Sequence, residues 1–204
     1  MPDSWRSRLL SAVSPLGSGV QGLNVTGYRP PGAEAFRPSR TAAVLVPVLD
    51  SPSPEIVLTR RSENLPQHPG QVSFPGGAAE QGDGSAVQTA LREAHEEIGL
   101  PIEVTKPIGF LDRMDTISDY RVLPVVALVQ PPVDWVLDTR EVAEVFSVPL
   151  SVVLDKDRYH GRQIERHGIE HTIWSLDWEG YTIWGVTAAI LMNLILRMQS
   201  GHEH

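Results

Sequence analysis

The most constraining feature of this sequence is a short segment, residues 86–98, whose acidic and apolar residues recur with the period of an α-helix. At about 100° per residue, Glu93, Glu96 and Glu97 fall on one side, because positions i, i+3 and i+4 share a helix face. The apolar residues of the segment cluster on the opposite side, at Val87, Ala90, Leu91, Ala94 and Ile98. The pattern therefore predicts a helix that packs into a core on one face and gathers three carboxylates on the other.

Carboxylates that lie so close together repel one another unless a cation lies among them. Their oxygens suit hard divalent cations such as Mg²⁺ or Mn²⁺ far better than they suit soft metals. A charged helix face is also a common form of solvated surface, so the acidic pattern alone leaves a metal site and a plain surface as alternatives.

The residues around the segment favour the metal site. Ser85, with Gln88 three residues later, fits a capping box at the start of a helix, and Gly99 fits the left-handed position just past its end. Gly76 and Gly77 precede the helix, and without a Cβ they allow a ligand to approach the backbone closely. We expect the glycine turn and the acidic helix to form a cradle for a metal–phosphate group.

Residues 92–100, REAHEEIGL, resemble the second half of a Nudix box, whose pattern is Arg-Glu-apolar-x-Glu-Glu-x-Gly-apolar. Two upstream stretches, LTRRS at residues 58–62 and GQVSFPGG at residues 70–77, resemble an extra signature that marks the coenzyme A pyrophosphatase branch of that superfamily. The resemblance covers residues 58–100 with little interruption. It implies a Nudix-type α/β/α sandwich with a mixed β-sheet.

The sequence departs from the Nudix box at one position. The usual pattern has a glutamate ahead of the helix, and counting back from Arg92 puts Gly84 in that place. One extra loop residue accounts for the shift and leaves Asp83 or Glu80 to take over the role. In the family this acid supports the loop and pairs with the arginine, so the departure concerns the loop more than the metal ligands.

The resemblance implies roles for residues of both motifs. Glu96 and Glu97 are expected as the main metal ligands, Glu93 as a ligand or as the residue that positions a base, and the Gly76 carbonyl as a further ligand. Arg92 is expected to point away from the three carboxylates and to organise the loop through an ion pair. Family members often take a base or an extra ligand from a later loop, and the sequence does not choose among Asp112, Asp115, Asp119, Glu141 and Glu144.

Two arginines of the upstream signature, Arg60 and Arg61, are candidates for binding the substrate together with Gly76 and Gly77. A guanidinium group suits bidentate recognition of a phosphate, such as the 3′-phosphate of coenzyme A. Because successive side chains of a strand point to opposite faces, we expect one of the two arginines to face the site and the other to face solvent.

The composition limits the kinds of molecule that this chain is expected to bind. The chain has 204 residues, no cysteine and a net charge of −8, which excludes thiolate chemistry and argues against non-specific binding of nucleic acid. An anionic small-molecule substrate is still compatible, since bound cations reverse the local field. The absence of an 18-residue apolar run and of a signal-peptide pattern predicts a cytoplasmic protein without membrane association.

The sequence predicts one Nudix hydrolase domain over residues 39–200. Residues 1–38 form a lead-in, with one short helix, that packs on the domain or extends it. We expect strands at 44–49, 56–59, 102–111, 122–129 and 133–137, and a connection at 142–154 that enters a short helix. A hairpin at 171–177 and 181–183 and a closing helix at 184–198 complete the prediction.

Function follows from the resemblance and the acidic helix together. The first hypothesis is a pyrophosphohydrolase, dependent on Mg²⁺ or Mn²⁺, that splits coenzyme A or acyl-coenzyme A into 4′-phosphopantetheine and adenosine 3′,5′-bisphosphate. The second is the same chemistry on another nucleoside diphosphate derivative, such as ADP-ribose, NADH or a nucleoside triphosphate. The third is a non-catalytic nucleotide-binding module, which has no need of three clustered acids. Homodimerisation is suggested by the resemblance alone.

Overall fold

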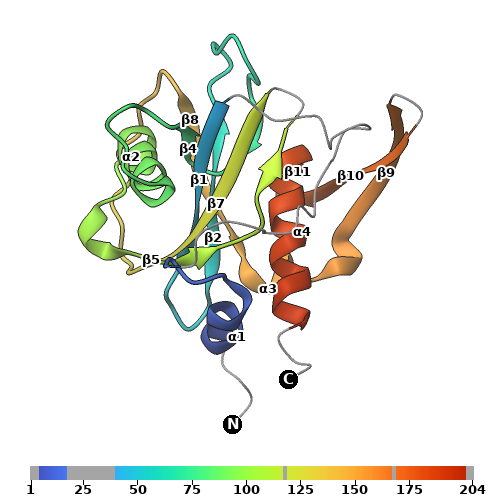
Figure 1. Cartoon of the computed structure of the whole chain (residues 1–204), viewed down its shortest axis with the longest axis horizontal. Helices are drawn as coiled ribbons and strands as arrows, with labels where there is room; N and C mark the ends of the chain where they lie inside the picture. Colours follow the sequence, from blue (N-terminus) through green and yellow to red (C-terminus); the bar gives the residue numbers. More distant parts are fainter. Residues whose placement is uncertain (1–4, 18–39, 117–118, 167–168, 201–204) are drawn as a thin grey trace.

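The computed structural model describes residues 5–17, 40–116, 119–166 and 169–200, and its centre is a mixed β-sheet (Figure 1). The main path of the eight-stranded sheet runs β3-β2-β1-β7-β5, with β4 paired to β1, β6 to β7 and β8 to β2. Strands β1 and β7 are parallel and the other pairs are antiparallel. The strands are β1 (Arg40–Leu49), β2 (Glu55–Arg61), β3 (Val72–Ser73), β4 (Gly76–Ala78), β5 (Thr105–Phe110), β6 (Met114–Asp115), β7 (Tyr120–Val129) and β8 (Val142–Pro149).

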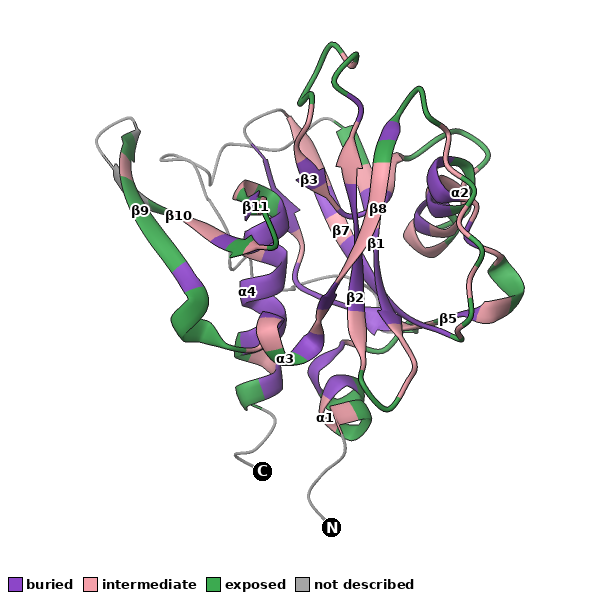
Figure 2. Ribbon diagram, turned by 180° about the vertical axis from the view of Figure 1, so that it is seen from behind, coloured by how far each residue is buried: buried purple, intermediate pink, exposed green. Residues whose placement is uncertain are grey.

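Helices cover both faces of this sheet, as Figures 1 and 2 show. Helix α2 (Ala86–Ile98) lies on one face, where its buried side chains join those of β1 and β7 in one hydrophobic cluster. Helices α1 (Trp5–Ala12), α3 (Leu150–Val153) and α4 (Gly185–Ser200) contribute to a second cluster on the other face. Two cores separated by one mixed sheet make the expected α/β/α sandwich, so the predicted fold class is confirmed.

A smaller antiparallel sheet, β11-β10-β9, stands beside α4 (Figure 1). Strands β10 (Ile169–Trp178) and β11 (Tyr181–Trp184) form the predicted hairpin around Glu179 and Gly180, both of which have positive φ angles. Strand β9 (Tyr159–Arg166) follows a 3₁₀ turn, η2 (Lys156–Arg158), and was not predicted. Its sequence is almost entirely polar or charged, so it lacks the apolar alternation that signals a strand.

Three expectations for the middle of the chain differ from the structure. Residues 133–137 form no strand, because this segment bonds to the end of α2: the Val136 amide donates to the Ile98 carbonyl at 3.1 Å, and the Asp138 amide to the Glu97 carbonyl at 3.0 Å. The connection expected from residue 142 is instead strand β8, which pairs with β2, and only the short helix after it is as predicted. The strand expected over 102–111 begins as a 3₁₀ turn, η1 (Ile102–Val104).

The N-terminal segment packs against the sandwich. Leu9 is fully buried, and Ser14 and Phe110 exchange two backbone hydrogen bonds of 2.9 Å at the outer edge of β5. From α4, Arg197 donates to the Ser14 hydroxyl at 2.9 Å and pairs with the buried carboxylate of Asp112 at 2.7 Å. The described part of the lead-in is therefore tied to β5 and α4.

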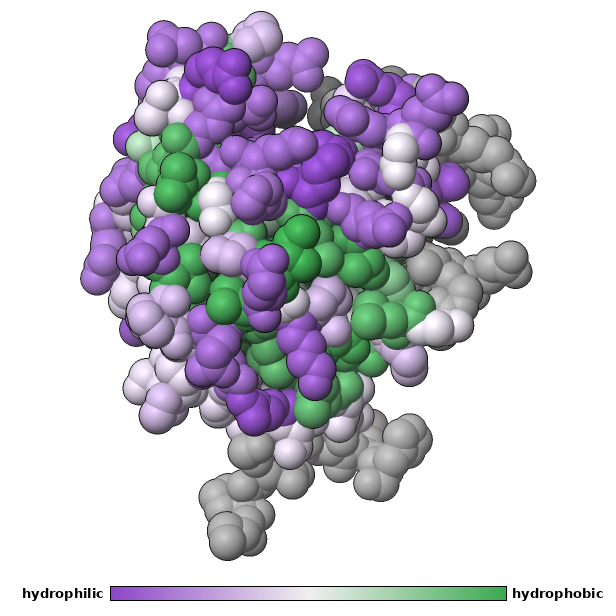
Figure 3. Space-filling model, turned by 90° about the vertical axis from the view of Figure 1, so that its left-hand side faces the viewer, coloured by the Kyte–Doolittle hydropathy of each residue, from purple (hydrophilic) through white to green (hydrophobic). Residues whose placement is uncertain are grey.

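The surface on the side of α2 carries a band of hydrophobic side chains with polar side chains above it (Figure 3). Two exposed apolar side chains, Ile102 and Val136, belong to the segments next to the C-terminal end of α2. Within the described ranges, the structure contains no helix with the length and apolar character needed to cross a membrane. Homodimerisation stays a prediction.

Candidate functional site

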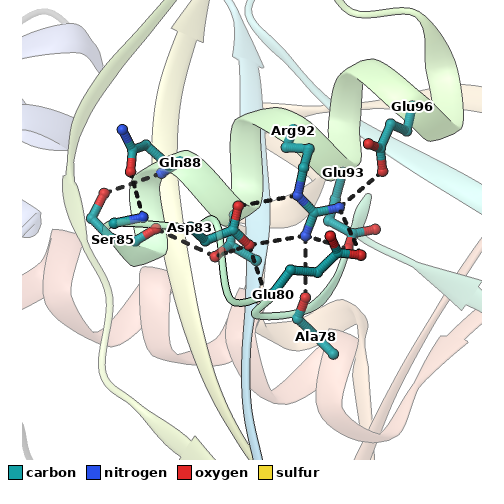
Figure 4. A network of polar contacts seen from close by, with 10 residues as sticks. Ala78, Glu80, Asp83, Ser85, Gln88, Arg92, Glu93 and Glu96 are labelled. Atoms are coloured by element: carbon teal, nitrogen blue, oxygen red, sulfur yellow. Dashed lines mark hydrogen bonds and ion pairs between the residues drawn. The ribbon is translucent and has the colours of Figure 1, made fainter.

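Helix α2 begins and ends at the predicted residues. The Ser85 hydroxyl accepts from the Gln88 amide at 3.3 Å, and Gly99 has φ 66°, the left-handed conformation of a helix end. The Gln88 side chain accepts from the amide of Gly84 at 2.7 Å, one residue before the position of an ordinary capping box (Figure 4). These local bonds fix where the glutamates of α2 lie relative to the loop before it.

The three glutamates occupy three different environments rather than one open face. Glu97 is buried, with 5% of its surface exposed, and its carboxylate accepts a hydrogen bond of 3.2 Å from the Gly76 amide. The side chain of Glu93 is 16% exposed, and that of Glu96 is 57% exposed. The three carboxylates that the sequence places on one helix face therefore differ in exposure, because the glycine turn covers Glu97.

Burial dominates the electrostatics of the inner two glutamates. It raises the pKa of Glu97 to about 8, against the opposing effects of the Gly76 hydrogen bond and the charge of Arg61. Burial also raises the pKa of Glu93, although the ion pair with Arg92 counteracts it. Ionising both groups is therefore unfavourable unless additional positive charge lies near them.

Arg92 lies among the acids of this loop and helix (Figure 4). Its guanidinium group pairs with Asp83 at 3.0 Å, Glu93 at 3.0 Å and Glu96 at 2.9 Å, and donates to the Ala78 carbonyl at 3.2 Å. The predicted loop-organising ion pair is present, but the expectation that Arg92 points away from the glutamates is wrong. The four-residue spacing to Glu96 places both side chains on one helix face, and its guanidinium also reaches Glu93.

Asp83 takes the place of the acid that the sequence lacks at Gly84. It pairs with Arg92 at 3.0 Å, whereas the other candidate, Glu80, lies 3.9 Å from the same guanidinium. The hydrogen bond from Arg92 is the main cause that holds the pKa of Asp83 well below its ordinary value. Thr89, which sequence reasoning missed, donates to Asp83 at 2.9 Å; its signal was a polar residue in the buried face of the helix.

The two glycines of the turn are needed for different reasons. At Gly76, φ is 155° and an added Cβ would lie 2.5 Å from the Ala43 carbonyl oxygen, so the backbone of β1 leaves no room for a side chain. At Gly77 an added Cβ would meet the Glu93 carboxylate at 2.6 Å. The turn therefore packs directly on the strand below it and on the acid beside it.

Arg60 and Arg61 project to opposite faces of the sheet, as strand alternation predicts. The charge of Arg61 acts on Glu97, on the side of α2, and its buried Nε has no hydrogen-bond partner in the described part of the chain. Arg60 pairs with Glu144 at 3.3 Å on the other side, where Tyr181 and Arg60 together lower the pKa of Glu144. Of the two, Arg61 belongs to the environment of the acidic helix.

The later acids divide in the same way. Asp112 pairs with Arg197, Asp115 with Arg113 and Arg121, and Glu144 with Arg60, so these carboxylates already have cationic partners. The charge of Glu141 contributes to the raised pKa values of both Glu93 and Glu97. Its backbone is held next to the end of β2, where the Ser62 amide donates to the Glu141 carbonyl at 2.8 Å. Of the five candidates, Glu141 is therefore the one that we place beside the glutamates of the acidic helix, because its charge acts on them.

Comparison with known proteins identifies the family. Residues 39–167 match the NUDIX domain. The chain belongs to the Nudix family. This Nudix chain is 42% identical over 159 residues to two proteins called "Uncharacterized Nudix hydrolase NudL", from Enterobacter sp. (strain 638) and Escherichia coli (strain K12), covering 78% of this chain and 83% of each relative. The solved structure of the MutT protein from Methanosarcina mazei Go1 has a TM-score of 0.51 and 18% identity over 81% of this chain and 96% of that one, which shows the shared fold.

Membership defines the general chemistry of this Nudix hydrolase: it hydrolyses the pyrophosphate link of a nucleoside diphosphate derivative. Nudix hydrolases generally use divalent metals, and the carboxylates of Glu93, Glu96 and Glu97 are the hard oxygen donors that Mg²⁺ and Mn²⁺ prefer. Among the described residues, no three acidic or histidine side chains lie close enough together to hold a metal ion, and Glu93 and Glu96 both pair with Arg92. The carboxylate oxygens are therefore the type of donor that binds a divalent cation, and the exact set of ligands stays a prediction.

Proposed function

We propose that this Nudix hydrolase cleaves coenzyme A and its thioesters to 4′-phosphopantetheine and adenosine 3′,5′-bisphosphate, with Mg²⁺ or Mn²⁺ as cofactor. The observation that carries the proposal is the meeting of the two sequence motifs at Glu97. Gly76, from the upstream signature, donates to the Glu97 carboxylate at 3.2 Å, and Arg61 of the same signature acts on that carboxylate through its charge. Residues that resemble a coenzyme A signature thus adjoin the acidic helix directly.

The bound divalent metal would polarise a phosphoryl oxygen and activate a water molecule. Glu93, Glu96 and Glu97 are the residues proposed to hold it, with the Gly76 carbonyl as a further ligand. Glu97 is buried, and the hydrogen bond from the Gly76 amide holds its carboxylate in place.

Arg92 is proposed to hold the loop through Asp83 and to compensate the charges of Glu93 and Glu96. Arg61 and the amides of the glycine turn would bind the negatively charged diphosphate, since guanidinium groups and backbone N–H groups both recognise phosphate oxygens. Arg60, on the opposite side of the sheet, was predicted as a substrate-binding residue and is paired with Glu144 and Glu63. We therefore propose Arg61, rather than Arg60, as the main arginine that binds the substrate.

The test is product analysis by chromatography after incubation of the purified protein with coenzyme A and Mg²⁺ or Mn²⁺. ADP-ribose and NADH serve as competing substrates, and EDTA removes the metal. The matched control for a Glu97→Gln variant is Glu165→Gln, because Glu165 is an exposed glutamate of β9.

Metal-dependent release of 4′-phosphopantetheine, with little turnover of the other compounds and loss of activity only in the Glu97 variant, is the expected result. Turnover of ADP-ribose or NADH without turnover of coenzyme A would keep the hydrolase chemistry and reject the substrate. If a folded wild-type protein turned over none of these compounds, both the substrate and the catalytic assignment would be rejected.

A further inference from the structure

Two arginines and one aspartate form a charged cluster where β6 pairs with the start of β7. The Nε atoms of Arg113 and Arg121 each lie 3.4 Å from the same carboxylate oxygen, Oδ1 of Asp115. The Nε of Arg113 is buried and makes no hydrogen bond within the described part of the chain. One carboxylate oxygen is thus shared by two guanidinium groups, and it satisfies neither of them fully.

The exposure of these side chains shows which way the cluster faces. Asp115 is 9% exposed, whereas the side chains of Arg113 and Arg121 are 27% and 32% exposed. The carboxylate therefore lies beneath the guanidinium groups, whose outer parts reach solvent. Two positive charges against one negative charge leave a local surplus, in a chain whose net charge is −8.

Strand register places this cluster on the same face of the sheet as the acidic helix. Gly77, where an added Cβ would meet the Glu93 carboxylate, lies opposite Ala43 in β1, and Ala43 lies opposite Leu123 in β7. Arg121 is two residues before Leu123 and shares its face, because side chains alternate along a strand. Leu123 packs in the hydrophobic cluster under α2, so Arg121 points to that side too.

The same register gives the separation. From Gly77 to Arg121 the backbone crosses two strand spacings and moves two residues along the strand, which amounts to roughly 12 Å. The guanidinium groups of Arg113 and Arg121 lie against Asp115 of β6, on the side of β7 that faces away from β1. A ligand held at the acidic helix would therefore extend across β7 to place a second anionic group against Arg113 and Arg121.

We propose that Arg113 and Arg121 form a subsite for a phosphate monoester of the substrate, separate from the site of its diphosphate. This inference rests on the proposed function for the identity of that group, which is the 3′-phosphate on the ribose of coenzyme A. A guanidinium pair that is held in place by a buried aspartate is preorganised for bidentate binding of phosphate oxygens. Asp115, which sequence reasoning considered as a base, is in this arrangement a positioning residue.

The experiment compares coenzyme A with dephospho-coenzyme A, which lacks only the 3′-phosphate. Wild type, Arg113→Gln, Arg121→Gln and Arg121→Lys are measured, with Arg158→Gln as control because Arg158 is an exposed arginine paired with an aspartate elsewhere. For each glutamine variant of the pair, we expect kcat/KM for coenzyme A to fall by about tenfold or more, mainly through KM. Turnover of dephospho-coenzyme A should stay within about twofold of wild type, and Arg121→Lys should recover part of the loss, since it keeps the charge but not the planar fork.

A structural role alone would lower the activity on both compounds equally, and that result would overturn the proposal, as would unchanged kinetics. Calorimetric binding of adenosine 3′,5′-bisphosphate and of adenosine 5′-monophosphate tests the subsite even if coenzyme A proves not to be the substrate. Wild type should bind the bisphosphate more tightly, and the variants should lose that difference. If wild type bound the two nucleotides equally, or if the variants weakened the binding of both nucleotides to the same extent, a substrate subsite would be excluded.

Discussion

Replacement of Glu97 by glutamine tests two consequences of burying this carboxylate beneath the glycine turn. The first is that its charge destabilises the folded protein, and the second is that the same charge is needed for pyrophosphatase activity. Glutamine has nearly the same shape and keeps an oxygen that can accept from the Gly76 amide, so it removes the charge and little else. Burial raises the pKa of Glu97. At a pH between the unfolded and the folded pKa, the folded wild type therefore keeps a proton on Glu97 that the unfolded chain has released.

The magnitude follows from the two pKa values. The pKa is about 8 in the folded protein and near its ordinary value of 4.5 in the unfolded chain. Between these values the folded state binds more protons, so the free energy of unfolding decreases as the pH rises. From pH 5 to pH 9 the loss from this group alone is about 4 kcal/mol. The stabilising contribution is thus complete only in acid, below the unfolded pKa.

The assay is urea unfolding of wild type, Glu97→Gln and Glu165→Gln at pH 5, 7 and 9, with EDTA in every sample. We expect the stability of wild type to fall by about 4 kcal/mol more than that of Glu97→Gln over this range, with Glu165→Gln following wild type. Pyrophosphatase activity of Glu97→Gln with added Mg²⁺ should drop by orders of magnitude while the fold survives. Parallel pH profiles for all three proteins would refute the argument from burial, and undiminished turnover would remove Glu97 from the metal site.

Three further substitutions test the glycine turn and the N-terminal contacts. Gly76→Ala places a Cβ 2.5 Å from the backbone of β1 at a φ of 155°, so chemical denaturation should show a loss of about 2–4 kcal/mol; wild-type stability would contradict the close packing. Gly77→Ala instead displaces the carboxylate of Glu93, and we expect stability within about 1 kcal/mol of wild type but about 100-fold lower kcat/KM; normal kinetics would show that this carboxylate needs no fixed place. Arg197→Met leaves the buried carboxylate of Asp112 without its guanidinium partner, and urea unfolding should show a loss of about 3 kcal/mol, whereas a loss below about 1 kcal/mol would mean that the remaining partners of Asp112 suffice.

The parts of the site that depend on neighbouring residues were predictable. The helix begins after Ser85 and ends before Gly99, as the sequence predicts, because each cap involves bonds within a few residues. The buried face of the helix, with Ala90 and Ala94, follows from the same period. The opposite faces of Arg60 and Arg61 follow from strand alternation, although alternation alone could not decide which arginine lies near Glu97.

Features that depend on distant pairing were not predictable. Glu97 is buried because β4 pairs with β1 and so holds the glycine turn over that part of α2, an arrangement that no local pattern encodes. Residues 133–137 are mostly apolar, as in a buried strand, but the backbone of this segment bonds to the carbonyls of Glu97 and Ile98 at the end of α2. The Arg113–Asp115–Arg121 cluster likewise arises from the pairing of β6 with β7.

The contact between Ser14 and Phe110 has a consequence for association between molecules of this chain. Phe110 lies at the outer edge of the sheet, where unpaired backbone groups would form a template for a strand of another molecule. Ser14 takes up both backbone hydrogen-bonding groups of Phe110, and Leu9 of the same N-terminal segment is fully buried. A shortened chain that started at residue 39, where the family match begins, would leave that edge open and would therefore be prone to aggregate, even with every residue of the acidic helix in place.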